Sequence, residues 1–244
     1  LKHVVGLKLA LTIPSFNEYV RCFPNKEITY INSALNNYKL SLDNLLEVLN
    51  KVDTLIVISP DNPSGSHLKY EETIKLLEEA KRLGKQIIFD ESFIDFADDN
   101  YTLINDDILL KYPNLIVIKS ISKSYGVPGL RLGILATSNK EYLGIINNNL
   151  PVWNINSFAE YFLQIINIYK KDYIKGCNKI KEERHRFYQE LTKIKELSIY
   201  NSEANYFMIK LNKGSSNELA EYLLTNNKIL IKVLNDKNGF DDYE

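Results

Sequence analysis

Three short runs of consecutive apolar residues constrain the fold of this chain more than any other feature of its sequence. The runs TLIVIS (54–59), QIIFDE (86–91) and NLIVIK (114–119) start 32 and then 28 residues apart. Unbroken apolar runs of this length are typical of strands that are covered on both faces, as in parallel sheets. LGILAT (132–137) predicts a further strand.

Helical patterns fill the intervals between these runs. In EETIKLLEEAKRLG (71–84), apolar residues recur at helical spacing, and Gly84 is suited to the helix end. A second helix is predicted from Leu42 to about Val52, with Ser41 as its N-cap. Strands that alternate with helices at this interval indicate an α/β fold, in which flanking helices cover a mostly parallel sheet.

The pattern changes near Asn148. The segments predicted beyond it are two long helices, a strand, a helix and a strand, at 156–173, 179–197, 205–211, 216–226 and 228–234. We therefore expect a large domain over residues 1–147 and a small C-terminal α+β domain over residues 148–244.

Composition excludes several classes of function. The 244 residues carry a formal net charge of −1, which gives no reason to expect binding to nucleic acid or to an acidic membrane surface. Cys22 and Cys177 are the only cysteines, which argues against a disulfide framework and suits a reducing, cytoplasmic location. No apolar stretch approaches the roughly 20 residues of a membrane helix. The histidines and cysteines have no metal-ligand spacing, and both glycine-rich nucleotide-binding motifs are absent.

Unusual polar residues follow three of the predicted strands. They lie in PDNPSG (60–65), DESFIDF (90–96) and SISK (120–123). Each has a simpler explanation alone, because NPSG can be an ordinary turn, Asp90 a helix N-cap and Lys123 a solvated loop residue. However, ligands of open α/β sheets bind at the carboxyl ends of the strands. Because all three polar segments lie at such ends, the sequence predicts a binding site at this edge of the sheet.

These motifs, in this order, resemble the class I/II aminotransferases of the pyridoxal-phosphate fold-type I superfamily. The resemblance rests on NPSG, DESFIDF and SKSYGVPGLRLG (122–133) and covers essentially the whole chain. Within the superfamily, the chain is similar to the histidinol-phosphate aminotransferase and threonine-phosphate decarboxylase branch. The motifs closest to the decarboxylases are PSFNEY (14–19), PGLRLG (128–133), LPVWNINS (150–157) and EANYFMIKL (203–211). A related subgroup, fused behind a nucleotidyltransferase, has similar motifs.

The resemblance implies how the chain binds pyridoxal 5'-phosphate. Lys123 matches the Schiff-base lysine, which can afterwards act as the base that moves a proton. Asp90 matches the acid that pairs with the pyridinium nitrogen, and Asn62 the amide that bonds the ring hydroxyl. Phe16 matches the aromatic residue that stacks on the ring, although its sequence context also allows a plain core phenylalanine.

Further residues are assigned by the same resemblance. Ser120, Ser122 and Arg131 match the ligands of the cofactor phosphate, for which the planar arginine fork is well suited. Phe93 stands where aminotransferases usually carry a tyrosine. A phenylalanine cannot bond the ring hydroxyl, so Asn62 would make that contact alone. This favours the decarboxylase-like branch without excluding transamination.

Three residues are expected near the substrate. Asn205 matches a position at the substrate end of the site. Trp153 and Asn156 are expected to line the same pocket, but hinge packing and helix capping explain them equally well.

The expected function is that of a pyridoxal-phosphate-dependent enzyme. It would transaminate or decarboxylate a small amino compound that carries a phosphate or phosphonate group. The first alternative is a ligand-sensing domain that binds the cofactor without turnover. The second is a structural domain without cofactor, against which the complete set of Asn62, Asp90, Lys123 and Arg131 argues.

The resemblance also implies missing parts and partners. Family members carry an earlier glycine-containing phosphate loop and a later strand with an arginine for the substrate carboxylate. Neither is found between Leu1 and Glu244. We therefore expect an N-terminally incomplete large domain, a truncated small domain and little activity from this chain alone. A homodimer is expected because such sites are shared between subunits, and an upstream nucleotidyltransferase would fit the fused subgroup.

Overall fold

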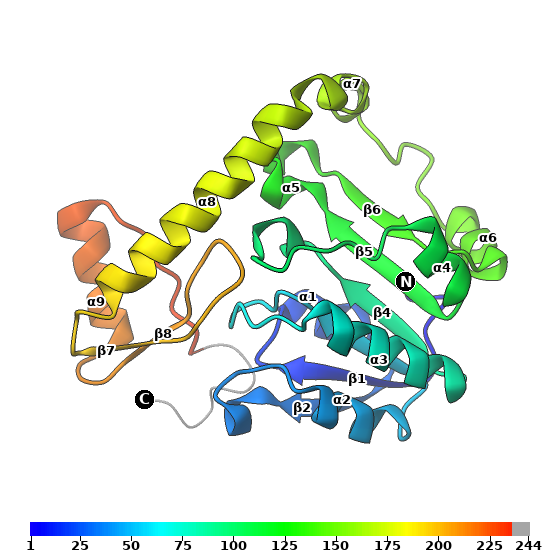
Figure 1. Ribbon diagram of the computed structural model, residues 1–244, viewed down its shortest axis with the longest axis horizontal. Helices are drawn as coiled ribbons and strands as arrows, with labels where there is room; N and C mark the ends of the chain where they lie inside the picture. Colours follow the sequence, from blue (N-terminus) through cyan, green and yellow to red (C-terminus); the bar gives the residue numbers. More distant parts are fainter. Residues whose placement is uncertain (236–244) are drawn as a thin grey trace.

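A computed structural model describes residues 1–235 and contains a six-stranded sheet with helices on both faces (Figure 1). The strand order is β2-β1-β3-β4-β5-β6, in which the first five strands are parallel and β6 runs antiparallel to β5. The strands are β1 (Lys8–Ile13), β2 (Glu27–Asn32), β3 (Thr54–Ile58), β4 (Gln86–Asp90), β5 (Leu115–Ser120) and β6 (Gly133–Ala136). The predicted α/β class with a mostly parallel sheet is confirmed.

The four apolar runs of the sequence form β3, β4, β5 and β6, whereas β1 and β2 were not predicted. Strand β1 is nevertheless central, since it pairs with both β2 and β3. Its apolar run, Leu9 to Leu11, is short and lies between a lysine and a threonine. Strand β2 is an edge strand with one buried residue, Ile31, so its sequence carries little apolar signal.

Alternate residues of the central strands pack into two separate cores. Leu55 and Val57 of β3 lie in one core, and Ile56 and Ile58 lie in the other. The helices that contribute to the first core are α2 (Leu42–Leu49), α3 (Tyr70–Arg82) and α4 (Asp106–Lys111). The second core is covered by α1 (Asn17–Cys22) and α6 (Lys140–Asn148). Because both faces are covered, the central strands β3, β4 and β5 carry runs of consecutive apolar residues.

Two predicted helix ends are confirmed, the start of α2 and the end of α3, whereas α2 ends at Leu49 rather than at about Val52. The Ser41 hydroxyl accepts a hydrogen bond from the Asn44 backbone N–H and caps α2. Gly84 follows α3 with a φ of 64°, a left-handed conformation that glycine adopts without steric cost.

The remaining described residues form a smaller unit around a long helix. Helix α7 (Ser157–Ile165) leads through a 3-10 turn (Ile166–Tyr169) into α8 (Lys170–Leu191). A two-stranded antiparallel sheet follows, with β7 (Leu197–Ile199) and β8 (Ile209–Leu211), and then α9 (Ser216–Tyr222). Figure 1 shows α8 extending from the edge of the large sheet to this small sheet.

Two strand predictions in this unit need correction. The segment predicted over 205–211 is a strand only from Ile209, and the segment predicted over 228–234 is not a strand. A strand needs a hydrogen-bonded partner, and among residues 1–235 none lies beside 228–234. Leu230 in this segment is 80% exposed. Residues 236–244, the end of the predicted small domain, lie outside the described part.

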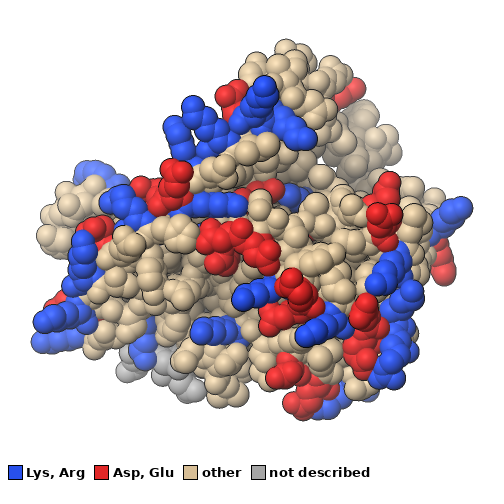
Figure 2. Space-filling model, in the orientation of Figure 1, with Lys and Arg blue, Asp and Glu red and all other residues tan. Residues whose placement is uncertain are grey.

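Charged side chains of both signs are interleaved on the face drawn in Figure 2, including the length of α8. This agrees with the near-zero net charge of the chain. Within residues 1–235, no helix is both long and apolar enough to cross a membrane.

Candidate functional site

The segments that carry the predicted site residues all follow neighbouring strands of the sheet. Phe16 follows β1, Asn62 follows β3, Asp90 ends β4 and Lys123 follows β5. Since β1, β3, β4 and β5 are consecutive parallel strands, the structure brings these four segments to one edge of the sheet.

Asp90 is a buried carboxylate, and both of its oxygens accept hydrogen bonds. Its Oδ1 accepts hydrogen bonds from the Ser92 backbone N–H at 2.9 Å and from the Ser92 hydroxyl, and its Oδ2 accepts one from the Tyr19 hydroxyl at 2.6 Å. Burial raises the pKa of Asp90, although these bonds and the charge of Lys123 act to lower it. No basic side chain of residues 1–235 forms an ion pair with Asp90. The carboxylate is therefore held in place and lacks a direct cationic partner.

Lys123 lies in the short helix α5 (Ile121–Ser124) and is exposed. Its Nζ is 5.7 Å from the centroid of the Phe93 ring, and Asp90 is near enough for its charge to be felt. Within the described part of the chain, no carboxylate forms an ion pair with Lys123. The amine is thus accessible and flanked by an aromatic ring.

The residues predicted to hold a phosphate lie on either side of Lys123. The Ser120 backbone N–H donates to the Ser92 hydroxyl at 2.9 Å, which links this loop to the Asp90 loop. Ser122 is buried. Arg131 has a φ of 56°, and its Nη1 donates to the Pro128 carbonyl at 3.0 Å. A left-handed arginine is a strained conformation, and such strain is concentrated at functional sites.

The loop with Asn62 is fixed by contacts from both parts of the chain. Inside the loop, the Ser64 hydroxyl donates to Asp61 Oδ2 at 2.6 Å. The Tyr206 hydroxyl, far along the sequence, donates to the Asp61 carbonyl at 2.7 Å. The Glu203 N–H donates to the Gly65 carbonyl at 2.8 Å. Residues 203–206 of the smaller unit therefore hold the backbone around Asn62.

The two phenylalanines of the site differ in exposure. Phe16 is 47% exposed and makes an edge contact with Tyr19 at 6.3 Å between ring centroids. Phe93 is buried, and Tyr206 meets it edge-on at 5.1 Å. Phe16 is thus not a core residue of this structure, and its ring is free to contact a ligand.

The three predicted substrate residues have different surroundings. Asn156 caps α7 by accepting from the Ala159 N–H at 3.0 Å, and its Nδ2 donates to the Leu130 carbonyl, also at 3.0 Å. The structure therefore links Asn156 to the Arg131 loop. Trp153 is 91% exposed on the segment between α6 and α7, and the exposed Asn205 precedes Tyr206.

Three residues at this edge were not identified from the sequence, namely Tyr19, Ser92 and Tyr206. Tyr19 follows Phe16 by three positions in PSFNEY, and residues at this spacing lie on the same face of a helix. The sequence could therefore have placed Tyr19 beside Phe16. Ser92 lies in the motif that was singled out. Tyr206 is separated from Asp61 by 145 positions, and no local pattern connects them.

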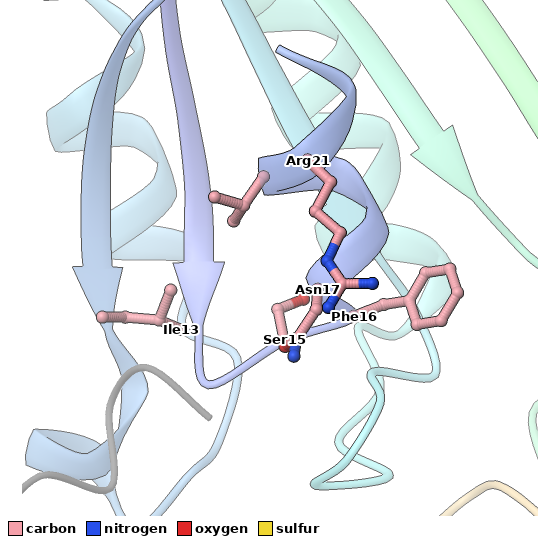
Figure 3. Close-up of a pocket in the computed structure, with 6 residues that line it drawn as sticks. Ile13, Ser15, Phe16, Asn17 and Arg21 are labelled. Carbon is pink, nitrogen blue, oxygen red and sulfur yellow. The ribbon is translucent and has the colours of Figure 1, made fainter. Parts of the chain in front are cut away.

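Among residues 1–235, no cluster of three or more histidine, cysteine, aspartate or glutamate side chains could hold a metal ion. A pocket is present beside Phe16, where β1 leads into α1 (Figure 3). It is lined by Ile13, Ser15, Phe16, Asn17, Val20 and Arg21.

Comparisons with known proteins agree on one family. The model of the family "Aminotransferase class I and II" matches residues 6–235. The L-serine phosphate decarboxylase of Campylobacter jejuni is 33% identical over 99% of this chain and 64% of its own length. The CMP-5'-(3-aminopropyl)phosphonate synthase of Streptomyces rubellomurinus is 29% identical over 95% of this chain and 37% of its own length. The chain thus spans less than two thirds of the length of these relatives.

A solved structure has the same fold. The histidinol-phosphate aminotransferase of Clostridium acetobutylicum superposes with a TM-score of 0.84 at 29% identity. The match covers 95% of this chain and 70% of that one.

Proposed function

Because the chain belongs to the class I and II aminotransferase family, whose members depend on pyridoxal phosphate, we propose that it is the core of an enzyme that uses this cofactor. Its substrate would be a small amino compound with a phosphate or phosphonate group. We propose decarboxylation or transamination as the reaction. The main support is the position of two residues at the ends of neighbouring strands. Asp90 is buried and has no ion-pair partner within residues 1–235, and Lys123 is exposed.

The residues present fit the cofactor. Burial raises the pKa of Asp90, so a protonated ring nitrogen would supply the positive charge that the carboxylate lacks. Lys123 would attach the cofactor aldehyde through Nζ. Asn62 would bond the ring hydroxyl, and the exposed Phe16 would cover the ring. Ser120, Ser122 and Arg131 would hold the phosphate.

The bound cofactor would supply an electron sink for the bond that breaks at the substrate α-carbon. The protein's own residues would control the proton and the orientation. Tyr19 and Ser92 fix both oxygens of Asp90, so the carboxylate cannot rotate away from the ring nitrogen. Lys123, without a carboxylate partner in the described part, is free to accept and return a proton. Phe93 offers no hydroxyl, which leaves the ring hydroxyl to Asn62.

The relatives support a phosphorylated substrate, since one is named for L-serine phosphate and another for an aminopropylphosphonate. Both reactions also have a precedent among the matches, in a decarboxylase and a histidinol-phosphate aminotransferase. We keep the division into domains at residues 147 and 148, a homodimer and an upstream nucleotidyltransferase as proposals.

The test starts with the colour of the cofactor-bound protein. Purified chain mixed with pyridoxal phosphate should gain the visible yellow absorbance of lysine-bound cofactor, and Lys123→Ala should lack it. Lys119→Ala is the matched control, because Lys119 is engaged by Asp95 at 2.9 Å. Carbon dioxide release from O-phospho-L-serine would indicate decarboxylation, whereas conversion of a keto acid would indicate transamination. A chain that stays colourless with added cofactor would refute the proposal.

A further inference from the structure

The pocket beside Phe16 has no role in the function proposed above. Its volume is about 170 Å³. Complete small-molecule sites have volumes of about 300 to 1,000 Å³, so this pocket suits one chemical group of a ligand rather than a whole ligand. Figure 3 shows the Arg21 side chain reaching back along α1, so that its guanidinium lies beside Asn17 and Phe16.

Arg21 has no carboxylate partner in the described part of the chain. Glu18 precedes it by three positions, a spacing that permits an ion pair on a helix, yet none forms. The Glu18 carboxylate instead accepts a weak bond from the Cys22 thiol. At three other places, a basic residue does pair with the glutamate three positions before it: Arg82 with Glu79, Arg186 with Glu183 and Lys193 with Glu190. The Arg21 guanidinium is therefore available to a ligand in the pocket.

The basic residues in β5 and in the segment that follows it already have roles. Lys119 is half-buried and pairs with Asp95 at 2.9 Å and with Glu91 at 3.9 Å. Lys123 and Arg131 are assigned to the cofactor aldehyde and the cofactor phosphate. A substrate with a second phosphate or phosphonate group would need a further cation, and Arg21 meets this need.

We propose that Arg21 binds the phosphate or phosphonate group of the substrate in this pocket, with the Asn17 side-chain amide as a second donor. A guanidinium donates two parallel hydrogen bonds to such a group, which gives both affinity and orientation. Phe16 lines the pocket and also belongs to the residues proposed to hold the cofactor, so the pocket adjoins the proposed cofactor site. The inference rests on the function proposed above and names the residue that would select the phosphorylated substrate.

The test compares Arg21→Gln, Arg21→Lys and the control Arg82→Gln in the full chain. Arg82 pairs with Glu79 on α3, where its charge is satisfied. The measurements are cofactor absorbance, calorimetric binding of O-phospho-L-serine with and without cofactor, and KM and kcat for O-phospho-L-serine against L-serine.

We expect Arg21→Gln to weaken binding of O-phospho-L-serine and to raise its KM by about ten-fold or more, the size of a lost charge-assisted bond. Cofactor absorbance, kcat and the response to L-serine should change little. Arg21→Lys should restore part of the affinity. If cofactor binds and O-phospho-L-serine affinity is equal in wild type and Arg21→Gln, the inference is wrong and the proposed function stands. If wild type binds no cofactor, the proposed function fails, and this inference fails with it.

Discussion

The Tyr206 hydroxyl donates a 2.7 Å hydrogen bond to the carbonyl of Asp61, the residue before Asn62. The same carbonyl also accepts from the Gly65 N–H at 2.8 Å. Tyr206 in addition meets Phe93 edge-on, and Phe93 lies under Lys123. One side chain of the smaller unit therefore contacts two parts of the proposed cofactor site. Because Phe93 carries no hydroxyl, the position of the Asn62 loop is expected to be critical for the cofactor ring.

Tyr206→Phe should loosen this loop while keeping the contact with Phe93. A hydrogen bond of this kind contributes about 1 kcal/mol, so we expect cofactor affinity to fall by about five-fold. Amide hydrogen exchange at Ser64 and Gly65 should become faster even without cofactor. Tyr188→Phe is the matched control, since Tyr188 packs on Phe207 and makes no hydrogen bond through its hydroxyl within residues 1–235. Unchanged exchange in Tyr206→Phe would show that other contacts hold the loop.

Gly65→Ala should be unusually destabilising. The φ of Gly65 is 72°, and an added Cβ would lie 2.0 Å from the Ser202 hydroxyl oxygen and 2.9 Å from its Cα. Gly84→Ala measures only the cost of placing an alanine in a left-handed backbone conformation. Gly84 has a φ of 64°, and no atom lies within 4 Å of the added Cβ. We expect about 1 to 2 kcal/mol for Gly84→Ala and clearly more for Gly65→Ala in urea unfolding. Equal losses would mean that the Ser202 segment moves away at little cost.

The candidate site could be predicted from the sequence where one rule sufficed. Asn62 and Lys123 each follow a recognisable buried strand and Asp90 ends another, and parallel strands bring their carboxyl ends to one edge. The contacts that fix these residues could not be predicted in the same way. Tyr206 and Asp61 meet only because the smaller unit packs on the large one, and that packing depends on the tertiary structure of both.

The fold itself was predictable from apolar runs, with two instructive failures. The apolar run of strand β1 is short and flanked by polar residues, so the central place of this strand depends on its pairing with β2 and β3 rather than on its own sequence pattern. The segment 228–234 shows the opposite case, in which the sequence pattern predicts a strand that does not form. Its apolar residues suggest a strand, but the described chain provides no partner strand beside it.

Asp90→Asn should stabilise the cofactor-free chain at neutral pH. Burial raises the pKa of Asp90 in the folded state, so the folded chain keeps this proton to a higher pH than the unfolded chain. The resulting stability is present below the unfolded pKa and is lost as the pH rises through the folded pKa. Removing the charge should therefore raise the free energy of unfolding at pH 7 by about 1 kcal/mol and leave it unchanged in acid.

The measurement is urea unfolding of wild type and Asp90→Asn from pH 4 to 8. Asp53→Asn is a control of opposite sign, because the Lys8 N–H donates to Asp53 Oδ2 at 2.9 Å and lowers the pKa of Asp53. That variant should lose stability at neutral pH relative to wild type. Asp90→Asn should also lose cofactor absorbance, since the amide cannot pair with a protonated ring. A neutral-pH stability below that of wild type would show that the bonds from Tyr19 and Ser92 outweigh the burial of the charge.

Arg184→Met should weaken the connection between the two parts of the chain. The Arg184 side chain on α8 is buried, and its guanidinium donates to the Phe96 carbonyl, to Asp98 Oδ1 at 2.8 Å and to Glu203 Oε2 at 3.2 Å. Methionine keeps much of the volume but leaves the Phe96 carbonyl without this donor. Because Asp98 and Glu203 remain partly exposed, we expect a loss of about 2 kcal/mol, below that of a fully buried pair.

Arg186→Met, two positions along α8, is the matched control, because Arg186 pairs with Glu183 in solvent and should cost little. Arg184 also bears on the proposed site, since Glu203 donates its N–H to Gly65 and accepts from Arg184. Amide exchange at Gly65 should therefore rise in Arg184→Met and not in Arg186→Met. If Arg184→Met loses stability without faster exchange at Gly65, then Tyr206 alone carries the coupling between the smaller unit and the Asn62 loop.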